Sequence, residues 1–342
     1  MRTIQLIDFG INNLKTIEQS QPEPKAEQVL VKIEAVSLNY VDLLVIKGLL
    51  NSDLSLPYIP ITDGAGVVER VGEKVTAFKP GDKVVTTFIP DWIDGEPTTV
   101  KTDYQTRQGL GSLPGQLSQY KCFESNQLIQ IPYNLTTAEA STLPIAGLTA
   151  WNALDYANLQ ANDTVLLHGT GGVSIFALQF AKSRGATVII TSSSDKKLNK
   201  ARQLGADLVI NYKNNPDWST TAHQMTKGKG VDVVVETVGG SNLGRSLDAL
   251  RMGGHISIVG LLDGFKSEID VLSLIHQQAT IRGLEVGGAH QFEAMNRAIE
   301  DLDLHPVIDR IFPLEQIQEA LSYLEKGSHF GKVVVTFETL RI

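Results

Sequence analysis

The chain has 342 residues, with 30 Lys or Arg against 38 Asp or Glu, a formal net charge of −8 and a pI near 5.4. This acidic balance argues against nucleic acid or an anionic membrane as a main partner, and the length fits two domains that each bury a core. The single cysteine, no visible secretion signal and no apolar run of about 20 residues together predict a cytoplasmic protein without disulfides or a multi-cysteine metal site.

The N-terminal third predicts a β-rich domain. Short apolar stretches, clearest at 29–35, 66–71 and 83–87, are separated by Gly and Pro in the way strands are separated by turns. Residues 91–119 are polar and show little periodicity, so we expect a long surface loop there. A capping box at Thr136 to Glu139 predicts the start of a helix, and a second helical stretch follows over 149–158.

From residue 164 onward, predicted strands alternate with helical segments. This alternation predicts an α/β fold with a doubly wound parallel sheet of the Rossmann type. The tail adds helices near 291–302 and 314–325 and a last strand over 332–336. The predicted strands of the sheet are 164–168, 187–191, 208–211, 232–236, 255–259 and 279–285.

A glycine-rich turn joins the first predicted strand of this sheet to the helix that follows it. The apolar strand that ends at residue 168 is followed by Gly169, Gly171, Gly172 and Val173, and then by a helical apolar pattern. Glycines let the backbone approach a pyrophosphate, and the first turn of the helix offers N–H groups to the phosphates. The third glycine of the usual motif is Ser174, so the surrounding strand, turn and helix have to support the prediction of a dinucleotide site.

The end of the second strand indicates which dinucleotide is bound. An NAD-binding chain normally has Asp or Glu about 20 residues after the glycines, but this one has Ser192, Ser193 and Ser194, with Lys197 nearby. Small hydroxyls leave room for a 2′-phosphate and the lysine supplies positive charge, which favours NADP(H). The alternative is that the serines only start a helix with a solvated charged face. Further coenzyme contacts are expected where later strands end, at Val238, Gly260 and Leu261.

Several sequence blocks together resemble the medium-chain dehydrogenase/reductase superfamily, in particular its zinc-free, quinone oxidoreductase-like branch. They span nearly the whole chain and occur in the family's order. The blocks are 31–42, 63–68, 71–72, 78–84, 148–151, the glycine turn, 204–207, 211–212, 253–254 and 331–334.

The resemblance implies a GroES-like catalytic domain over 1–127 and 288–342, around a Rossmann dinucleotide-binding domain over 128–287. It also implies a homodimer or homotetramer. By position, Ser192, Lys197 and Tyr212 match the residues that hold the 2′-phosphate of NADPH in quinone oxidoreductases. Phe330 and Lys332 lie where the family's tail approaches the coenzyme, although Lys332 is equally explained as the first residue of a strand.

The resemblance also implies that no metal is bound. Where zinc-dependent relatives have their catalytic ligands, this chain has Asn39, Thr62, Asp63 and Ile145, which do not form a tetrahedral nitrogen and sulfur site. Side chains would then have to replace a Lewis acid worth several kcal/mol. A conjugated carbonyl or a quinone spreads the developing charge itself, so we expect hydride transfer from NADPH to such an acceptor.

Three residues are candidates for catalysis. Asn39 occupies a former ligand position and is expected to hydrogen-bond the coenzyme or substrate, with a loop cap as the alternative. Tyr40 is a candidate donor to an enolate, with a partly buried packing role as the alternative. Thr149 resembles a residue near the nicotinamide, and its alternative is a helix N-cap. Asp42 and Asp63 are expected to make structural hydrogen bonds to turn amides.

Two other functions stay open from the sequence. One is a zinc-free NAD(P)-dependent alcohol dehydrogenase that oxidises an activated alcohol. The other is a non-enzymatic protein that binds NADPH or RNA, which the acidic composition makes less favourable.

Overall fold

The structure, a computed structural model, describes residues 1–337 and divides into two compact units. Unit 1 contains Met1–Leu148 and the segment that begins at Gly287, and unit 2 is Thr149–Val286. Residues 128–148 therefore belong to unit 1, whereas the sequence-based boundary placed them in the Rossmann domain. The reason is strand pairing, because strand β7 (Leu128–Gln130) extends the sheet of unit 1 and helix α2 (Thr137–Ala140) packs on it.

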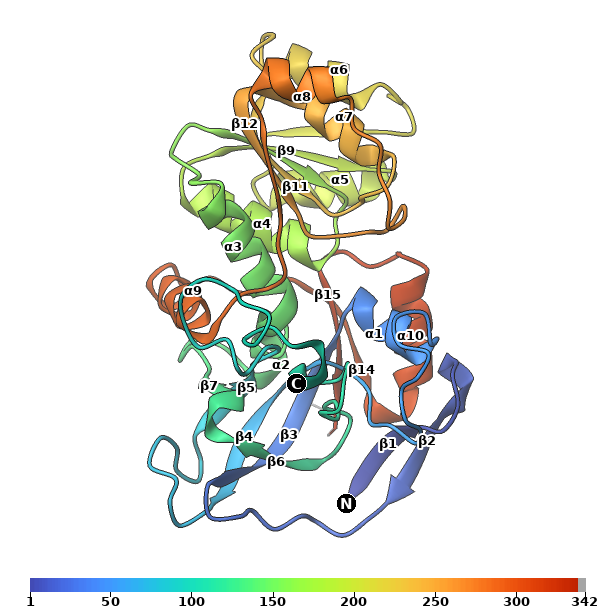
Figure 1. Cartoon of the computed structure of the whole chain (residues 1–342), viewed down its shortest axis with the longest axis vertical. Coiled ribbons are helices and arrows are strands. Elements are labelled where there is room, and N and C mark those ends of the chain that lie inside the picture. The colour runs from blue at the N-terminus through green and yellow to red at the C-terminus, as the bar shows by residue number, and fades with distance from the viewer. Residues whose placement is uncertain (338–342) are drawn as a thin grey trace. The chain divides into compact units, whose positions relative to one another are not determined.

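The central element of unit 1 is one long strand with antiparallel partners. Strand β3 (Gln28–Leu38) pairs with β4 (Asp63–Val71), β6 (Tyr120–Glu124) and β15 (Lys332–Thr336), so it joins the N-terminal part of the chain to the tail (Figure 1). The main sheet runs β14-β15-β3-β4-β5-β7, where β14 is Ile308–Pro313 and β5 is Lys83–Thr86. A separate ladder is formed by β1 (Arg2–Leu6) and β2 (Leu14–Glu18).

Unit 1 also contains helices, which are joined by irregular chain. They are α1 (Tyr40–Ile46), α2, α9 (Ala289–Asp301) and α10 (Ile317–Glu325), preceded in the last case by a 3₁₀ turn at Leu314–Gln316. The core includes Ile33, Phe123 and Phe312, all fully buried. Residues 91–119 form a loop as predicted, with a 3₁₀ turn at Tyr104–Thr106, but the loop is not confined to the surface, since Leu110, Gln116 and Leu117 are buried. The predicted β-rich domain is confirmed.

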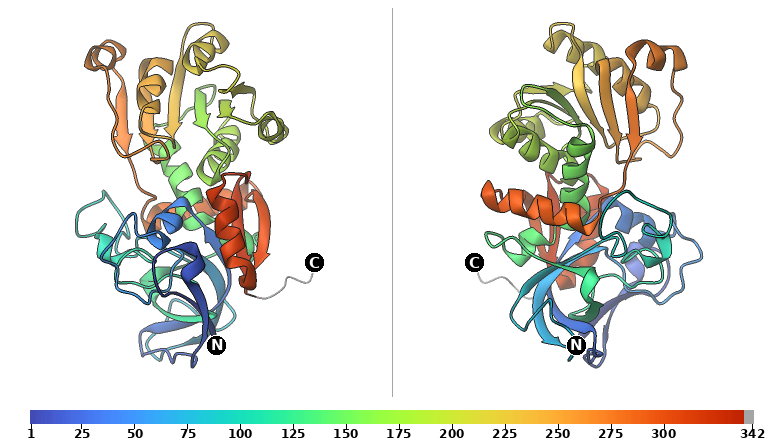
Figure 2. Two further views of the ribbon diagram at one scale, coloured as in Figure 1. Left: turned by 90° about the vertical axis from the view of Figure 1, so that its right-hand side faces the viewer. Right: turned by 60° about the vertical axis from the view of Figure 1, so that its left-hand side comes forward.

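Unit 2 is a parallel sheet in the order β10-β9-β8-β11-β12-β13, with crossover helices on both faces (Figure 2). This confirms the predicted Rossmann-type α/β fold, since the strand order reverses beside β8. The strands are β8 (Thr164–His168), β9 (Thr187–Ser192), β10 (Leu208–Asn211), β11 (Val231–Glu236), β12 (Leu250–Ile258) and β13 (Thr280–Gly283). The helices are α3 (Leu148–Tyr156), α4 (Gly172–Ser183), α5 (Asp195–Gln203), α6 (Trp218–Met225), α7 (Asn242–Ala249) and α8 (Val271–Gln277).

The strands of unit 2 follow from their composition. Runs such as Val233–Val235 are apolar and β-branched on both faces, which suits strands buried between two layers of helices. Polar residues stand at the carboxyl ends, where His168, Ser192 and Glu236 close β8, β9 and β11. This edge is where such sheets bind ligands. Among residues 1–337, no helix is long and apolar enough to cross a membrane.

Candidate active site

In unit 1, Asn39 joins the end of β3 to the start of α1. It is only 7% exposed and N-caps the helix in an extended conformation, with its backbone N–H donating to the Asp42 carboxylate at 2.7 Å. Its side-chain amide donates to Asp63 at 2.8 Å and to Thr62 at 3.2 Å, and its Oδ1 accepts from Lys332 Nζ at 2.6 Å. Both N–H donors of the amide are therefore engaged within the protein. The cap position of Asn39 is confirmed, and its predicted hydrogen bond to the coenzyme or substrate stays a prediction.

Lys332 is the buried cation of this cluster. It is the first residue of β15, is 4% exposed, and donates a second bond from Nζ to the Leu38 carbonyl at 2.7 Å. Burial lowers the pKa of its ammonium to about 8, and the carboxyls of Asp63 and Asp42 oppose that shift. The strand position of Lys332 is confirmed, and its predicted contact with the coenzyme stays a prediction.

Two buried carboxyls balance this cation. Asp42 accepts from the amides of Asn39 and Thr62, the latter at 2.9 Å, and burial raises its pKa to about 6. Asp63 Oδ2 also accepts from the Ile145 amide at 3.3 Å, while its Oδ1 has no hydrogen-bond partner among residues 1–337. Burial raises the pKa of Asp63 to about 7, against the nearby Lys332 charge. The structural hydrogen bonds predicted for both aspartates are present.

The glycine turn of unit 2 leaves an open approach to the backbone. Gly169 follows β8 with φ +70°, and a Cβ placed there would meet nothing within 4 Å. Gly171 is the N-cap of α4, and Gly172 and Val173 begin its first turn. Ser174, in the third glycine position, is buried and donates its hydroxyl to the His168 carbonyl at 2.6 Å. Helix N–H groups beside an open glycine fit a bound pyrophosphate.

The residues proposed for a 2′-phosphate lie together at the ends of β9 and β10. Ser192 closes β9, and its carbonyl accepts from the Tyr212 amide at 3.2 Å. Ser194 N-caps α5 by accepting from the Lys197 amide at 3.4 Å, so the serines do start a helix as the alternative stated. Asp195, the nearest acid, has its carboxylate bound to Asn211 at 2.7 Å.

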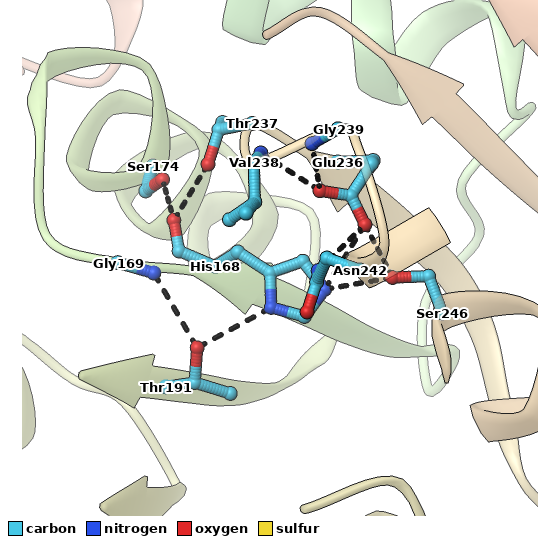
Figure 3. A network of polar contacts seen from close by, with 10 residues as sticks. All are labelled: His168, Gly169, Ser174, Thr191, Glu236, Thr237, Val238, Gly239, Asn242 and Ser246. Atoms are coloured by element: carbon cyan, nitrogen blue, oxygen red, sulfur yellow. Dashed lines mark hydrogen bonds and ion pairs between the residues drawn. The ribbon is translucent and has the colours of Figure 1, made fainter. Parts of the chain in front are cut away.

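A buried carboxylate that the sequence analysis did not single out organises the neighbouring strand end. Glu236 is fully buried, and its Oε1 accepts from the amides of Val238 at 2.7 Å and Gly239 at 3.0 Å (Figure 3). Its Oε2 accepts from Asn242 Nδ2 at 2.9 Å and from the Ser246 hydroxyl. A signal was available, since Glu236 directly follows three valines of a buried strand and a carboxylate buried there needs donors.

The ring of His168 lies beside this carboxylate. Its Nε2 is 3.0 Å from Ser246 Oγ and 3.5 Å from Glu236 Oε2, while Nδ1 is 3.3 Å from Thr191 Oγ1 (Figure 3). Burial lowers the pKa of His168, and the Glu236 charge opposes this shift. The imidazole therefore connects three adjacent strands at the ligand-binding edge. The sequence analysis placed His168 at the strand end without a role for its ring.

The other predicted site residues differ in their exposure and in their position in the fold. Tyr40 is 45% exposed, which is compatible with both the donor role and the partly buried packing role, so both stay predictions. Thr149 lies inside α3, which continues directly from a π-helical turn at Leu143–Gly147, so Thr149 is not an N-cap. Phe330 is buried in unit 1. Gly260 and Leu261 follow β12, beside the turn after β11.

Comparisons with known proteins agree with this organisation. The alcohol dehydrogenase GroES-like domain family matches residues 25–133, and the zinc-binding dehydrogenase family matches residues 172–301. A zinc-type alcohol dehydrogenase-like protein of Schizosaccharomyces pombe is 41% identical over 338 residues, which cover 96% of each chain. The chain belongs to the medium-chain dehydrogenase/reductase superfamily. It is accordingly an oxidoreductase that uses a nicotinamide coenzyme.

Two further similarities place the chain within this superfamily. The quinone oxidoreductase of Mus musculus is 29% identical over 347 residues, covering 98% of this chain and 97% of the relative. A solved structure from Sinorhizobium meliloti 1021, named as a proposed alcohol dehydrogenase, is 41% identical with a TM-score of 0.92 and covers 98% of each chain. Relatives named for quinone and for alcohol chemistry thus both resemble this medium-chain enzyme.

The family description raises the question of zinc, and the donor set here does not fit it. The four positions that match the zinc ligands of relatives do come together, as Asp63 accepts hydrogen bonds from both Asn39 and Ile145 and Asn39 donates to Thr62. Their atoms are an amide, a hydroxyl, one carboxyl and a peptide N–H, with the Lys332 ammonium next to them. Zinc sites use thiolate, imidazole and carboxylate ligands, and no group of three or more such residues lies together in 1–337.

Proposed function

We propose that this protein is a metal-independent, NADPH-dependent reductase that transfers hydride to a quinone or to an α,β-unsaturated carbonyl compound. The observation that carries the proposal is the Lys332 ammonium, which donates to Asn39 Oδ1 at 2.6 Å at the former ligand positions. A fixed internal cation with its own carboxyl partners disfavours a second cation at the same place. The family relatives named quinone oxidoreductase support the choice of acceptor.

The proposed reaction needs a hydride and a donor to the oxygen of the substrate that becomes negative. When bound, the reduced nicotinamide supplies the hydride. Tyr40 has an exposed ring, and its hydroxyl is the proposed donor to the oxygen that becomes negative. Asn39 uses both amide donors within the protein, so we propose that it holds the strand end in position and does not itself bind substrate oxygen. A conjugated acceptor suits this limited set because it delocalises the new charge.

We propose NADPH as the preferred coenzyme because of the end of β9. Ser192 stands where an acid would bind the ribose hydroxyls, and Lys197 and Tyr212 lie at the adjacent helix start and strand end. One similarity points the other way, since a structure named NAD-dependent alcohol dehydrogenase is 32% identical, with a TM-score of 0.89 and coverage of 99% of this chain and all of that one. Titration of the protein with NADPH and NADH separates the two, and equal affinities would remove the argument from Ser192.

The substrate class is tested by following coenzyme oxidation with quinones, enals, enoyl thioesters and aldehydes, and coenzyme reduction with an alcohol panel. Turnover of quinones or enones well above alcohols supports the proposal. Comparable rates with alcohols favour the zinc-free alcohol dehydrogenase. Tight NADPH binding without any turnover favours a non-enzymatic role.

Metal independence is tested on the same preparation. Elemental analysis should find much less than one zinc per chain, and a chelator should leave turnover unchanged. One tightly held zinc per chain, with activity lost on its removal, would overturn the proposed mechanism.

We propose further that the protein is a homodimer or homotetramer. Strand β13 is at the edge of its sheet, and α8 nearby exposes Val271, Leu272 and Ile275, each about 60% exposed. Exposed edges and apolar patches of this kind favour association with another chain. Light scattering coupled to gel filtration gives the mass, and Ile275→Asp should lower it to that of one chain, whereas a monomeric parent protein contradicts the proposal.

A further inference from the structure

The contacts around His168 form a chain of hydrogen bonds in which each group donates toward the next, in one direction. The Ser246 hydroxyl donates to Glu236, so its oxygen is left to accept from His168 Nε2. A neutral imidazole that donates from Nε2 accepts at Nδ1, and the Thr191 hydroxyl is the donor there. Thr191 Oγ1 in turn accepts from the Gly169 amide at 3.4 Å. The chain therefore runs from the glycine turn to the Glu236 carboxylate (Figure 3).

The carboxylate fixes this direction because it can only accept. Glu236 receives N–H and O–H groups from four residues and faces the imidazole as a fifth neighbour. A buried carboxylate is unfavourable unless such donors satisfy it, so these groups are held in one arrangement. A neutral glutamine in its place would present an amide N–H₂ group to donors and break the pattern at one or both oxygens.

Glu236 also holds the loop that follows β12. Its backbone carbonyl accepts from the amides of Val259 at 2.9 Å and Gly260 at 3.2 Å, and the Val238 carbonyl accepts from the Asp263 amide at 2.8 Å. A Cβ on Gly260 would lie 2.0 Å from the Thr237 carbonyl oxygen, so the two loops are in close contact. We call residues 238–241 and 260–263 the coenzyme shelf, because they follow adjacent strands at the ligand-binding edge.

The same network reaches the glycine turn from a second side. The His168 carbonyl accepts from the hydroxyls of Ser174 at 2.6 Å and Thr237 at 2.9 Å. Ser174 belongs to the first turn of α4 and Thr237 directly follows Glu236. The turn that would bind the pyrophosphate and the coenzyme shelf are thus joined by hydroxyl groups as well as by the imidazole.

We propose that Glu236 is a positioning residue for the nicotinamide half of the coenzyme. It acts through the Ser246 to Gly169 chain and through the amides of Val238 and Gly239, and it holds the shelf and the glycine turn in the arrangement that the whole dinucleotide needs. The adenosine half, at the ends of β9 and β10, does not depend on it. This inference rests on the nucleotide binding proposed above.

The test compares the whole coenzyme with its adenosine fragment. In Glu236→Gln, the dissociation constant for NADPH should rise at least about tenfold, the loss expected for one charge-assisted hydrogen bond, while that for 2′-AMP, which has no 5′-phosphate to meet the glycine turn, stays within about twofold. Asp232→Asn is the matched control. Asp232 is on the same strand, is 3% exposed, and accepts from the Thr164 amide at 2.8 Å, yet it lies at the opposite end of β11. This control should lower stability and leave the ratio of the two dissociation constants unchanged.

Three results would overturn the inference: equal weakening of NADPH and 2′-AMP in Glu236→Gln, no weakening of either, or an equal change of the ratio in the Asp232 control. If Glu236→Gln does not fold, Ser246→Ala breaks the chain and keeps the charge, and it should weaken NADPH at least about threefold with 2′-AMP unchanged. If the parent protein prefers NADH, the coenzyme proposal fails and the same comparison is made with NADH and adenosine.

Discussion

The two units bury carboxyl groups in opposite ways. Unit 1 places Asp42 and Asp63 around the Lys332 ammonium, so the negative charge is met by a cation that belongs to the protein. Unit 2 buries Glu236 with amide and hydroxyl donors and a neutral histidine, and no formal cation within residues 1–337 donates a hydrogen bond to this carboxylate. Under the metal-independent mechanism proposed above, the internal Lys332 cation of unit 1 takes the place of an external ion, whereas unit 2 uses dipoles to hold loops in place.

The largest expected effect comes from removing the internal cation. Lys332→Met leaves two buried carboxyls without a counter-charge, and the free energy of unfolding should fall by about 3–5 kcal/mol. Urea denaturation measures this loss. Lys182→Met is the control, because its partly exposed ion pair with Asp207 contributes at most about 1 kcal/mol.

The pH dependence of that loss has a defined sign. Burial raises the pKa of Asp42 to about 6 and of Asp63 to about 7, so the folded protein binds more protons than the unfolded chain between about pH 4 and 7. Their contribution to stability therefore falls as the pH rises through this window. Without the ammonium these pKa values rise further, so Lys332→Met should lose more stability at pH 8 than at pH 5. An equal loss at both pH values would contradict the ionic account of the cluster.

A smaller effect is expected at the residue that links the cation to the carboxyls. Asn39→Ala removes one of the two acceptors of Lys332 and one donor to Asp63, which should cost about 1–3 kcal/mol of stability and slow turnover. Tyr40→Phe, next in the chain, changes an exposed ring and should alter stability by less than about 0.5 kcal/mol. Chemical denaturation and turnover are measured for both variants. Unchanged turnover in a folded Asn39→Ala protein would leave Asn39 with a purely structural role.

The smallest effect on a free energy is expected at the proposed site for the 2′-phosphate of NADPH in unit 2. Lys197→Ala should weaken NADPH binding by about 1 kcal/mol, roughly fivefold, and leave NADH binding unchanged, because a cation at an accessible helix start is partly screened. Lys200→Ala, on the same helix α5, is the control and should leave both affinities unchanged. Fluorescence titration measures both coenzymes. An equal loss of NADH affinity would exclude a role specific to the 2′-phosphate.

The fold could be predicted in outline because its signals are local. Strands such as 208–211 and 332–336 were predicted with the bounds that the structure has, since apolar β-branched runs between turn residues have few alternatives. The domain boundary near residue 127 was not predictable in this way. Whether Leu128–Gln130 joins one sheet or the other depends on pairing with Lys83–Thr86, some 45 residues earlier, which no local pattern reports.

The sequence by itself determined the glycine turn, the serines at the end of β9 and the absence of the usual zinc ligands at the matching positions, because each depends on residue type within a short segment. Only the tertiary structure decided that Lys332 meets Asn39, and that Glu236 connects through Ser246 and His168 to Gly169. Those contacts join residues that lie far apart in the chain. A buried charge must be satisfied by whatever donors folding brings to it, so its partners are fixed by topology and burial and not by sequence spacing.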